Sequence, residues 1–177
     1  MGLVAGGLFL VGAAIIFALQ LSEPPTASSF DLSAIPAEVN FRAPAITLND
    51  LQGRTNSLAD YLDRVVLVNN WAIWCPPCKA EMPTLQDYYN SHAKQGFVII
   101  GIEAGDPANE VASFVAEYRL TFPIWLDPLG KATDAFQNYN LPSSYVIDRS
   151  GTVRLAWVGE ISREMLEKYV TPLIEEK

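Results

Sequence analysis

Residues 65–83 read VVLVNNWAIWCPPCKAEMP, an apolar run that leads directly into a Cys-Pro-Pro-Cys motif. The continuous β-branched and apolar residues at 65–68 are typical of a strand that is buried on both faces. Proline is favoured in the first turn of a helix and glycine just after a helix end, so a helix is predicted from near Pro76 to near Gly96. The two cysteines therefore lie where a buried strand passes into a helix.

The remaining sequence predicts one α/β domain built around this strand and helix. A second buried strand at 97–102 completes a βαβ unit with parallel strands, and the short link between strands at 144–148 and 152–158 makes those two antiparallel. Further predicted elements are a hairpin of 45–48 with 55–58, a helix from its N-cap Asp106 to Tyr118, a strand at 124–126, a short helix at 131–138, and a final helix at 163–175 capped by Ser162.

The expected fold class follows from this order of elements. It is α/β, with a mixed central β-sheet flanked by helices on both faces and an N-terminal β-hairpin extension. The domain is expected over 41–177, after a linker over 23–40 that is rich in proline, serine and alanine.

The first residues predict a membrane anchor. Residues 1–22 contain no charged side chain, and the apolar part, about 19 residues at 1.5 Å each, gives roughly 28 Å of helix, enough to cross a bilayer. We therefore expect a single transmembrane helix over 1–22, or an uncleaved signal. A cleaved signal peptide is the alternative, with a weak cleavage candidate at Ala27-Ser-Ser29.

Composition excludes several functions. The chain has 177 residues, a formal net charge of −8 and 12 Lys+Arg, which argues against nucleic acid as a partner because phosphate needs a basic face. Two cysteines and one histidine are too few for a disulfide scaffold or a four-cysteine zinc site. No cofactor is expected beyond a redox-active pair of cysteines.

The spacing of Cys75 and Cys78 suits thiol-disulfide exchange. Cys75 lies at a helix N-terminus, where the dipole and free N–H groups stabilise a thiolate, so it is the expected exposed nucleophile. Cys78 lies one turn further on, more buried, and can resolve a mixed disulfide. Pro76 and Pro77 offer no N–H to the sulfur, so we predict a reductant or an isomerase rather than a strong oxidant. A structural disulfide or half of a zinc site remains the alternative.

The phrase WAIWCPPC, Pro83 in the following helix and the segment 141-LPSSYVID-148 together resemble the thioredoxin fold. With the leading hairpin and the apolar front, residues 41–177 are similar to the TlpA/ResA-like membrane-anchored thiol-disulfide oxidoreductases. The resemblance implies that Cys75 is the nucleophile and Cys78 the resolving thiol. It also implies that Pro142 is cis and packs against the disulfide, which turns the backbone of Leu141 toward a substrate strand.

Other residues of the site follow from the same resemblance. Trp74 matches the aromatic residue beside the cysteines. Asp106 matches a nearby carboxylate that takes the proton of Cys78, although a helix N-cap is an equal alternative. Asn69 stands where thioredoxins have a buried acid, so that proton relay is expected to be absent, and Asn70 replaces an aromatic residue. Lys79 and Glu81 are expected to be solvated.

The expected function is therefore that of a protein-disulfide reductase on the extracytoplasmic side of the cell membrane, held by a single pass. The expected partners are a disulfide-containing protein substrate and a membrane thiol electron donor. The resemblance suggests substrates in cytochrome c maturation or copper-site assembly. The alternatives are a thiol peroxidase of the peroxiredoxin class, although no Pro-x-x-x-Thr/Ser approach precedes Cys75, and a copper-binding assembly chaperone, for which His92 is the one histidine.

Overall fold

The computed structural model describes residues 35–176. The membrane span predicted over 1–22 and the linker predicted over 23–40, as far as residue 34, lie outside the described residues. Within residues 35–176, no helix combines the length and the apolar character needed to cross a bilayer.

One mixed sheet of eight strands organises the described residues, in the order β1-β8-β7-β4-β5-β6-β2-β3. The central pair β4 and β5 is parallel, as predicted, and β7 and β8 run antiparallel to their neighbours. The strands are β1 (Ala37–Arg42), β2 (Thr47–Asp50), β3 (Thr55–Ser57), β4 (Val65–Trp71), β5 (Phe97–Glu103), β6 (Ile124–Leu126), β7 (Ser143–Ile147) and β8 (Thr152–Val158).

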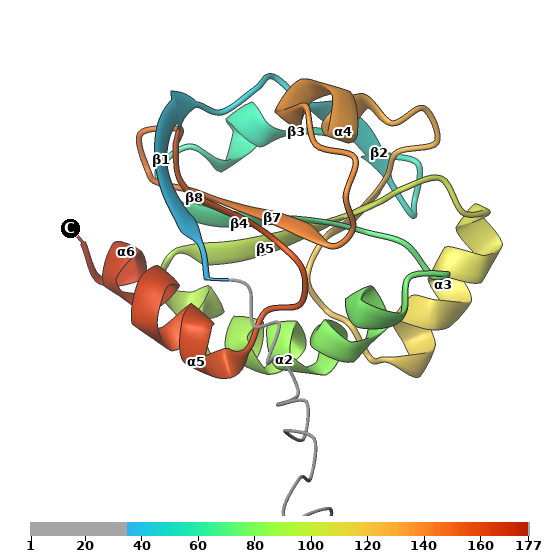
Figure 1. Cartoon of the computed structure of the whole chain (residues 1–177). Helices are drawn as coiled ribbons and strands as arrows, with labels where there is room; N and C mark the ends of the chain where they lie inside the picture. Colours follow the sequence, from blue (N-terminus) through green and yellow to red (C-terminus); the bar gives the residue numbers. More distant parts are fainter. Residues whose placement is uncertain (1–34, 177) are drawn as a thin grey trace, which may run out of the picture. The chain divides into compact units, whose positions relative to one another are not determined.

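Helices cover both faces of this sheet (Figure 1). The long helix α2, α3 and the C-terminal helical segment lie on one face, and α4 lies on the other with the short 3₁₀ helix η1. Their bounds are η1 (Leu58–Tyr61), α2 (Pro76–His92), η2 (Ala93–Gln95), α3 (Ala108–Glu117), α4 (Lys131–Phe136), α5 (Arg163–Met165), the π-helical turn η3 (Leu166–Val170) and α6 (Thr171–Glu175).

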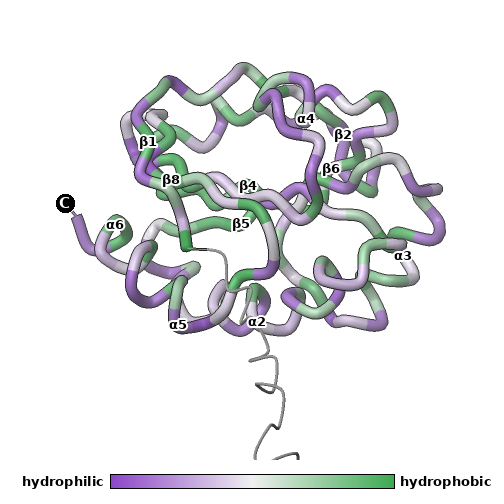
Figure 2. Tube along the Cα trace, in the orientation of Figure 1, coloured by the Kyte–Doolittle hydropathy of each residue, from purple (hydrophilic) through white to green (hydrophobic). Residues whose placement is uncertain are grey.

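The sheet separates two hydrophobic cores. Alternate residues of a strand point to opposite faces, so Leu67 of β4 packs in the core under α2 and α3, whereas Val66 and Val68 pack in the core under α4 and η1. Figure 2 shows hydrophobic residues along strands such as β5 and hydrophilic residues at α5. All seven residues of β4 are buried, which explains the unbroken apolar run at 65–68; Asn69 and Asn70 are the buried polar residues that follow it.

Two predictions about the ends of elements were wrong, and a third element has an unexpected internal turn. Residues 37–40 of the predicted linker belong to β1, an edge strand that pairs with β8 but is mostly exposed, so it shows no apolar alternation. The side chain of Asp106 does not cap α3, which begins at Ala108. The final helical segment spans the predicted bounds, 163–175, but it is divided into α5, the π-helical turn η3 and α6, and the second residue of α6 is Pro172, which cannot donate a backbone hydrogen bond.

Gly101 of β5 provides a test of the packing between β5 and its two neighbouring strands. A Cβ built at this position would lie 2.9 Å from Cδ1 of Ile124 and 3.1 Å from Nε1 of Trp71. We therefore expect Gly101→Ala to destabilise the protein by about 1–3 kcal/mol through overpacking. Urea denaturation of the oxidised protein measures this loss. Gly53→Asn is the control, since Gly53 has open space and a left-handed φ that asparagine tolerates; an equal loss in both variants would contradict the packing argument.

Candidate active site

Cys75 and Cys78 form a disulfide at the start of α2, with their Cα atoms 5.3 Å apart. Cys75 is the N-cap residue of the helix, and its sulfur accepts a hydrogen bond from the backbone N–H of Cys78 at 3.3 Å. The backbone therefore presents a donor to the sulfur of Cys75. A thiolate at this atom would be stabilised by that donor and by the helix dipole.

The surroundings of the two sulfurs differ less than the sequence predicted. Cys78 is fully buried, and Cys75, expected to be exposed, is only 3% exposed in the disulfide form. The exposed residues around the two cysteines are Pro76, Pro77 and Trp74, of which Trp74 is 66% exposed. The predicted order, with Cys78 the more buried of the two, is nonetheless present.

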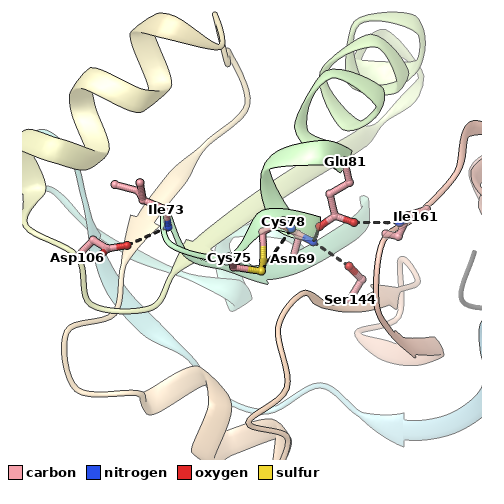
Figure 3. The surroundings of a disulfide bond; sticks show 8 residues. All are labelled: Asn69, Ile73, Cys75, Cys78, Glu81, Asp106, Ser144 and Ile161. Atoms are coloured by element: carbon pink, nitrogen blue, oxygen red, sulfur yellow. Dashed lines mark hydrogen bonds between the residues drawn. A yellow bond between two sulfur atoms is a disulfide. The ribbon is translucent and has the colours of Figure 1, made fainter. Parts of the chain in front are cut away.

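A buried carboxyl lies one helical turn after Cys78. Glu81 has no exposed surface, and both of its oxygens accept hydrogen bonds: Oε1 from the side-chain amide of Asn69 at 2.8 Å, and Oε2 from the backbone N–H of Ile161 at 3.0 Å. The same amide nitrogen of Asn69 also donates to Oγ of Ser144 at 3.0 Å. Figure 3 shows this network beside the disulfide, joining α2 to β4, to β7 and to the segment after β8.

Burial dominates the electrostatics of Glu81. Desolvation raises its pKa to about 8, against the two hydrogen bonds from Asn69 and Ile161, which favour the charged form. The nearby charge of Glu160 raises the pKa further. A carboxyl with a pKa near that of a free thiol, about 8.5, can exchange a proton with one at little cost.

The expectation that Glu81 is solvated was therefore wrong. Its helical position carried a signal, because residues three and four apart share a face of a helix. Glu81 follows Cys78 by three residues and precedes Leu85 by four, and both of these residues are fully buried. The resemblance places a buried acid at the position of Asn69 on β4, whereas in this protein the buried acid is Glu81 on α2.

Two further carboxyls, those of Glu103 and Asp106, lie on the opposite side of the loop that precedes Cys75. Oδ2 of Asp106 accepts a hydrogen bond from the backbone N–H of Ile73 at 2.9 Å, and Asp106 lies away from Glu81 in Figure 3. Glu103, fully buried at the end of β5, accepts from the backbone N–H groups of Gly105 and Asp106. Burial, and then a hydrogen bond with the Asp106 side chain, raises the pKa of Glu103 to about 8.

This pair fastens the loop that carries the nucleophile. Besides the bond to Ile73, the backbone N–H of Ala104 donates to the carbonyl of Trp71 at 2.9 Å. The loop between β4 and Cys75 is thus held by the segment 104–106 at two points. The observed contact of Asp106 is with this loop, whereas Glu81 is the acid that follows Cys78 on its helix.

The cis peptide bond that the resemblance implies at Pro142 is present. The Leu141–Pro142 peptide bond is cis. Pro142 is buried, Leu141 is half-buried, and the carbonyl of Pro142 accepts from the backbone N–H of Gly159 at 2.8 Å. Two residues further on, Ser144 joins the network of Asn69 and Glu81, so the strand that begins at the cis-proline is linked to the buried acid.

Comparison with known proteins identifies the family. The sequence profile of the AhpC/TSA family matches residues 39–156. The chain belongs to the AhpC/TSA family. The thiol-disulfide oxidoreductase ResA of Geobacillus kaustophilus is 34% identical over 132 residues, which cover 75% of this chain and 76% of the relative. ResA of Oceanobacillus iheyensis is 30% identical over 175 residues, or 94% of this chain and 85% of the relative.

Solved structures agree with this assignment. A thiol:disulfide interchange protein from Chlorobium tepidum has a TM-score of 0.69 at 26% identity, covering 78% of this chain and 99% of its own. A secreted thiol-disulfide isomerase from Corynebacterium glutamicum, at 23% identity, has a TM-score of 0.74 over 84% of this chain and 96% of its own, and shows the thioredoxin-like fold. Together with the Cys75–Cys78 disulfide, the ResA relatives identify the chain as a thiol-disulfide oxidoreductase.

Asp106 can be tested for its role in the loop. Asp106→Asn keeps an oxygen that accepts from Ile73, whereas Asp106→Ala removes it. We expect the alanine variant to lose about tenfold in the rate at which reduced Cys75 attacks a small disulfide, since a displaced nucleophile loses favourable orientation. The asparagine variant should retain most of the rate. If both variants lose the rate equally, the carboxylate acts as a proton acceptor rather than as an anchor.

The two raised carboxyls predict how stability depends on pH. An unfolded glutamate releases its proton near pH 4.5, whereas folded Glu81 and Glu103 retain theirs until about pH 8. The folded state therefore binds more protons across this window, and the free energy of unfolding falls as pH rises from about 5 to 8. Urea titrations of the oxidised protein at several pH values should show this decline. Glu81→Gln and Glu103→Gln should each flatten it, and an unchanged slope would contradict the burial effect.

Proposed function

We propose that this protein is a membrane-tethered, extracytoplasmic protein-disulfide reductase whose reaction is carried by Cys75 and Cys78. The observation that supports it is the position of the disulfide, at the N-terminus of α2 and one turn before the buried carboxyl of Glu81. This arrangement offers an attacking sulfur, a resolving sulfur and a proton acceptor in one short segment.

The proposed reaction begins with the reduced pair. The thiolate of Cys75 attacks one sulfur of the substrate disulfide, which forms a mixed disulfide and releases the first substrate thiolate. The donor at Cys78 N–H and the helix dipole stabilise the attacking charge. Trp74, exposed beside the nucleophile, and the segment Leu141–Pro142 border the position of the substrate.

The second step involves the buried acid. In the fraction of molecules in which Glu81 is ionised, the thiol of Cys78 transfers its proton to the Glu81 carboxylate, and the resulting thiolate attacks the sulfur of Cys75. The mixed disulfide breaks, the second substrate thiolate leaves, and the Cys75–Cys78 disulfide forms. Two electrons have then passed from the dithiol to the substrate, and the reaction as written needs no cofactor.

The direction of electron transfer, from the dithiol to the substrate, is proposed from the two residues between the cysteines. Pro76 and Pro77 have no N–H, so the structure provides only the N–H of Cys78 as a backbone donor from this turn to the Cys75 sulfur. A less stabilised thiolate makes the reduced form the stronger electron donor. The oxidised protein would be reduced again by a membrane thiol donor.

Tethering and substrate class are proposed from the sequence. The apolar residues 1–22 supply the anchor and residues 23–36 a spacer, and protein disulfides persist outside the cytoplasm. The ResA-like character favours an oxidised cysteine pair in an unfolded cytochrome c or a copper-site assembly protein as the substrate.

The two alternatives fit the site less well. Both cysteines of the chain are used by the disulfide, so a peroxidase would have to use Cys75 or Cys78 itself as the peroxidatic residue. For a copper chaperone, His92 stands 14 residues beyond Cys78 on α2, roughly 21 Å away along the helix. Its ring packs against that of Tyr88 at a tilt of 33°, with the ring centroids 4.2 Å apart, and its Nδ1 lies 3.0 Å from the carbonyl oxygen of Tyr88.

A trapping experiment tests the reductase. In Cys78→Ser, the mixed disulfide on Cys75 cannot be resolved, so we expect it to accumulate when the reduced variant meets an apocytochrome c peptide whose cysteine pair is oxidised. Mass spectrometry of non-reduced protein measures the adduct. Wild type should instead release the reduced peptide, and Cys75→Ser should form no adduct. Reaction of Cys78→Ser with a small disulfide but not with the peptide would exclude this substrate class.

A further inference from the structure

Asn69 and Asn70 are neighbours on β4 that are both buried and both bonded to β7, but they face opposite sides of the sheet. Both are buried, and each amide nitrogen donates to a serine of β7: Asn69 to Ser144 at 3.0 Å and Asn70 to Ser143 at 3.3 Å. Because alternate residues of a strand face opposite sides, only Asn69 points to the side of α2. Its amide adds a bond to Glu81.

The hydrogen bonds of Asn69 match the charged form of Glu81. A carboxylate only accepts, and here the amide of Asn69 donates one hydrogen to Glu81 and the other to Ser144. The amide oxygen of Asn69 has no hydrogen-bond partner within the described residues. The side chain therefore has all of its donors in use and its acceptor idle.

The protonated form of Glu81 requires the opposite arrangement. A carboxylic acid must donate its O–H, and a buried donor without an acceptor is costly. Rotation of the Asn69 amide by half a turn places its oxygen against both Glu81 and Ser144. The oxygen has two lone pairs, and the serine hydroxyl can rotate to donate. In each orientation, either the NH₂ group or the oxygen of the Asn69 amide is hydrogen-bonded to both Glu81 and Ser144, and the other group of the amide has no partner. Neither orientation is therefore fixed by a bond on the far side of the amide.

We propose that Asn69 is a positioning residue for the exchange reaction, whose amide holds Glu81 beside Cys78 and reverses its hydrogen bonds when Glu81 gains or loses a proton. The proposal rests on the proposed role of Glu81 as the proton acceptor of Cys78. It explains how a fully buried acid can take a proton and return it without losing its partner on β4. Ser144 is the second anchor, and Ile161 holds the other oxygen.

The other groups around Glu81 define the background of a titration. Glu160, next to Ile161, raises the pKa of Glu81, and the donor on Ile161 lowers it. The disulfide of Cys75 and Cys78 does not titrate, so the oxidised protein isolates the effect of Asn69. Glu103, whose pKa is also raised to about 8 but which contacts the segment 105–106, is an internal reference.

The first test is a carbon-13 NMR titration of glutamate side chains in the oxidised protein, with Glu81→Gln and Glu103→Gln to assign the two raised signals. Asn69→Ala removes the amide donor, so we expect the pKa of Glu81 to rise by about one to two, while that of Glu103 stays. Ser144→Ala should shift Glu81 less, in either direction. Asn70→Ala and Ser143→Ala, the matched controls on the opposite face, should leave both glutamates unchanged.

The second test follows the reaction by stopped flow with a chromogenic aromatic disulfide. Attack by Cys75 releases the first thiolate and attack by Cys78 the second. We expect Asn69→Ala to slow the second phase at pH 7 by about tenfold and to move its pH dependence upward, with the first phase unchanged. Asn70→Ala should leave both phases intact.

If Asn69→Ala fails to fold, Asn69→Asp keeps the size of the side chain and removes the amide. The introduced carboxyl and that of Glu81 should then titrate as a coupled pair, and the higher of the two apparent pKa values should exceed that of Glu81 in the wild type. An unmoved pKa of Glu81 in a folded Asn69 variant overturns the proposal, as does equal slowing by Asn69→Ala and Asn70→Ala. Absence of the second phase in wild type would instead refute the proposed function, and the NMR result would still stand.

Discussion

Burial of one carboxyl, that of Glu81, is the interaction on which the site depends. A desolvated acid is tolerated only when its oxygens have donors, and the donors come from Asn69 on β4 and Ile161 after β8. Because these residues are distant in sequence, the two hydrogen bonds fix the first turns of α2 against the sheet and against the segment that leads to α5. The turn that carries Cys78 is thereby held in register with the strand beneath it.

The two buried glutamates have similar pKa values but different freedom. Glu103 is held by the rigid backbone N–H groups of Gly105 and Asp106, and its neighbour Asp106 is itself bound to Ile73. A change of charge there would disturb the loop that carries the nucleophile. Glu81 instead contacts a side-chain amide that can present either a donor or an acceptor. Protonation can therefore be exchanged at Glu81 with little movement, whereas Glu103 serves to keep a loop in place.

Much of the fold was predictable because it rests on local patterns. The apolar run at 65–68 forms a strand and the prolines stand at the start of α2, as predicted; Gly96, in the left-handed conformation, ends the 3₁₀ turn η2 that follows α2. The edge strand β1 was missed because its residues are mostly exposed and only its backbone pairing with β8 defines it. In the site, redox chemistry at Cys75 and Cys78 was predicted from their spacing together with their place between a buried strand and a helix. The burial of Glu81 was missed because a glutamate is ordinarily solvated; its place on the helical face of Cys78 and Leu85 was the local signal, and the tertiary partners Asn69 and Ile161 make the burial possible.

The place of the acid also has a consequence for the chemistry. If the acid were on β4, its distance from Cys78 would depend on how α2 packs on the sheet, so any shift of α2 would change the distance between the acid and the thiol. Glu81 lies on the same helix as Cys78, three residues on, and the geometry of a single helical turn sets the separation of their backbones. What the sheet then contributes is an amide rather than a charge. The resolving thiol and its proton acceptor move together, and β4 sets the energy of the proton on that acceptor through Asn69.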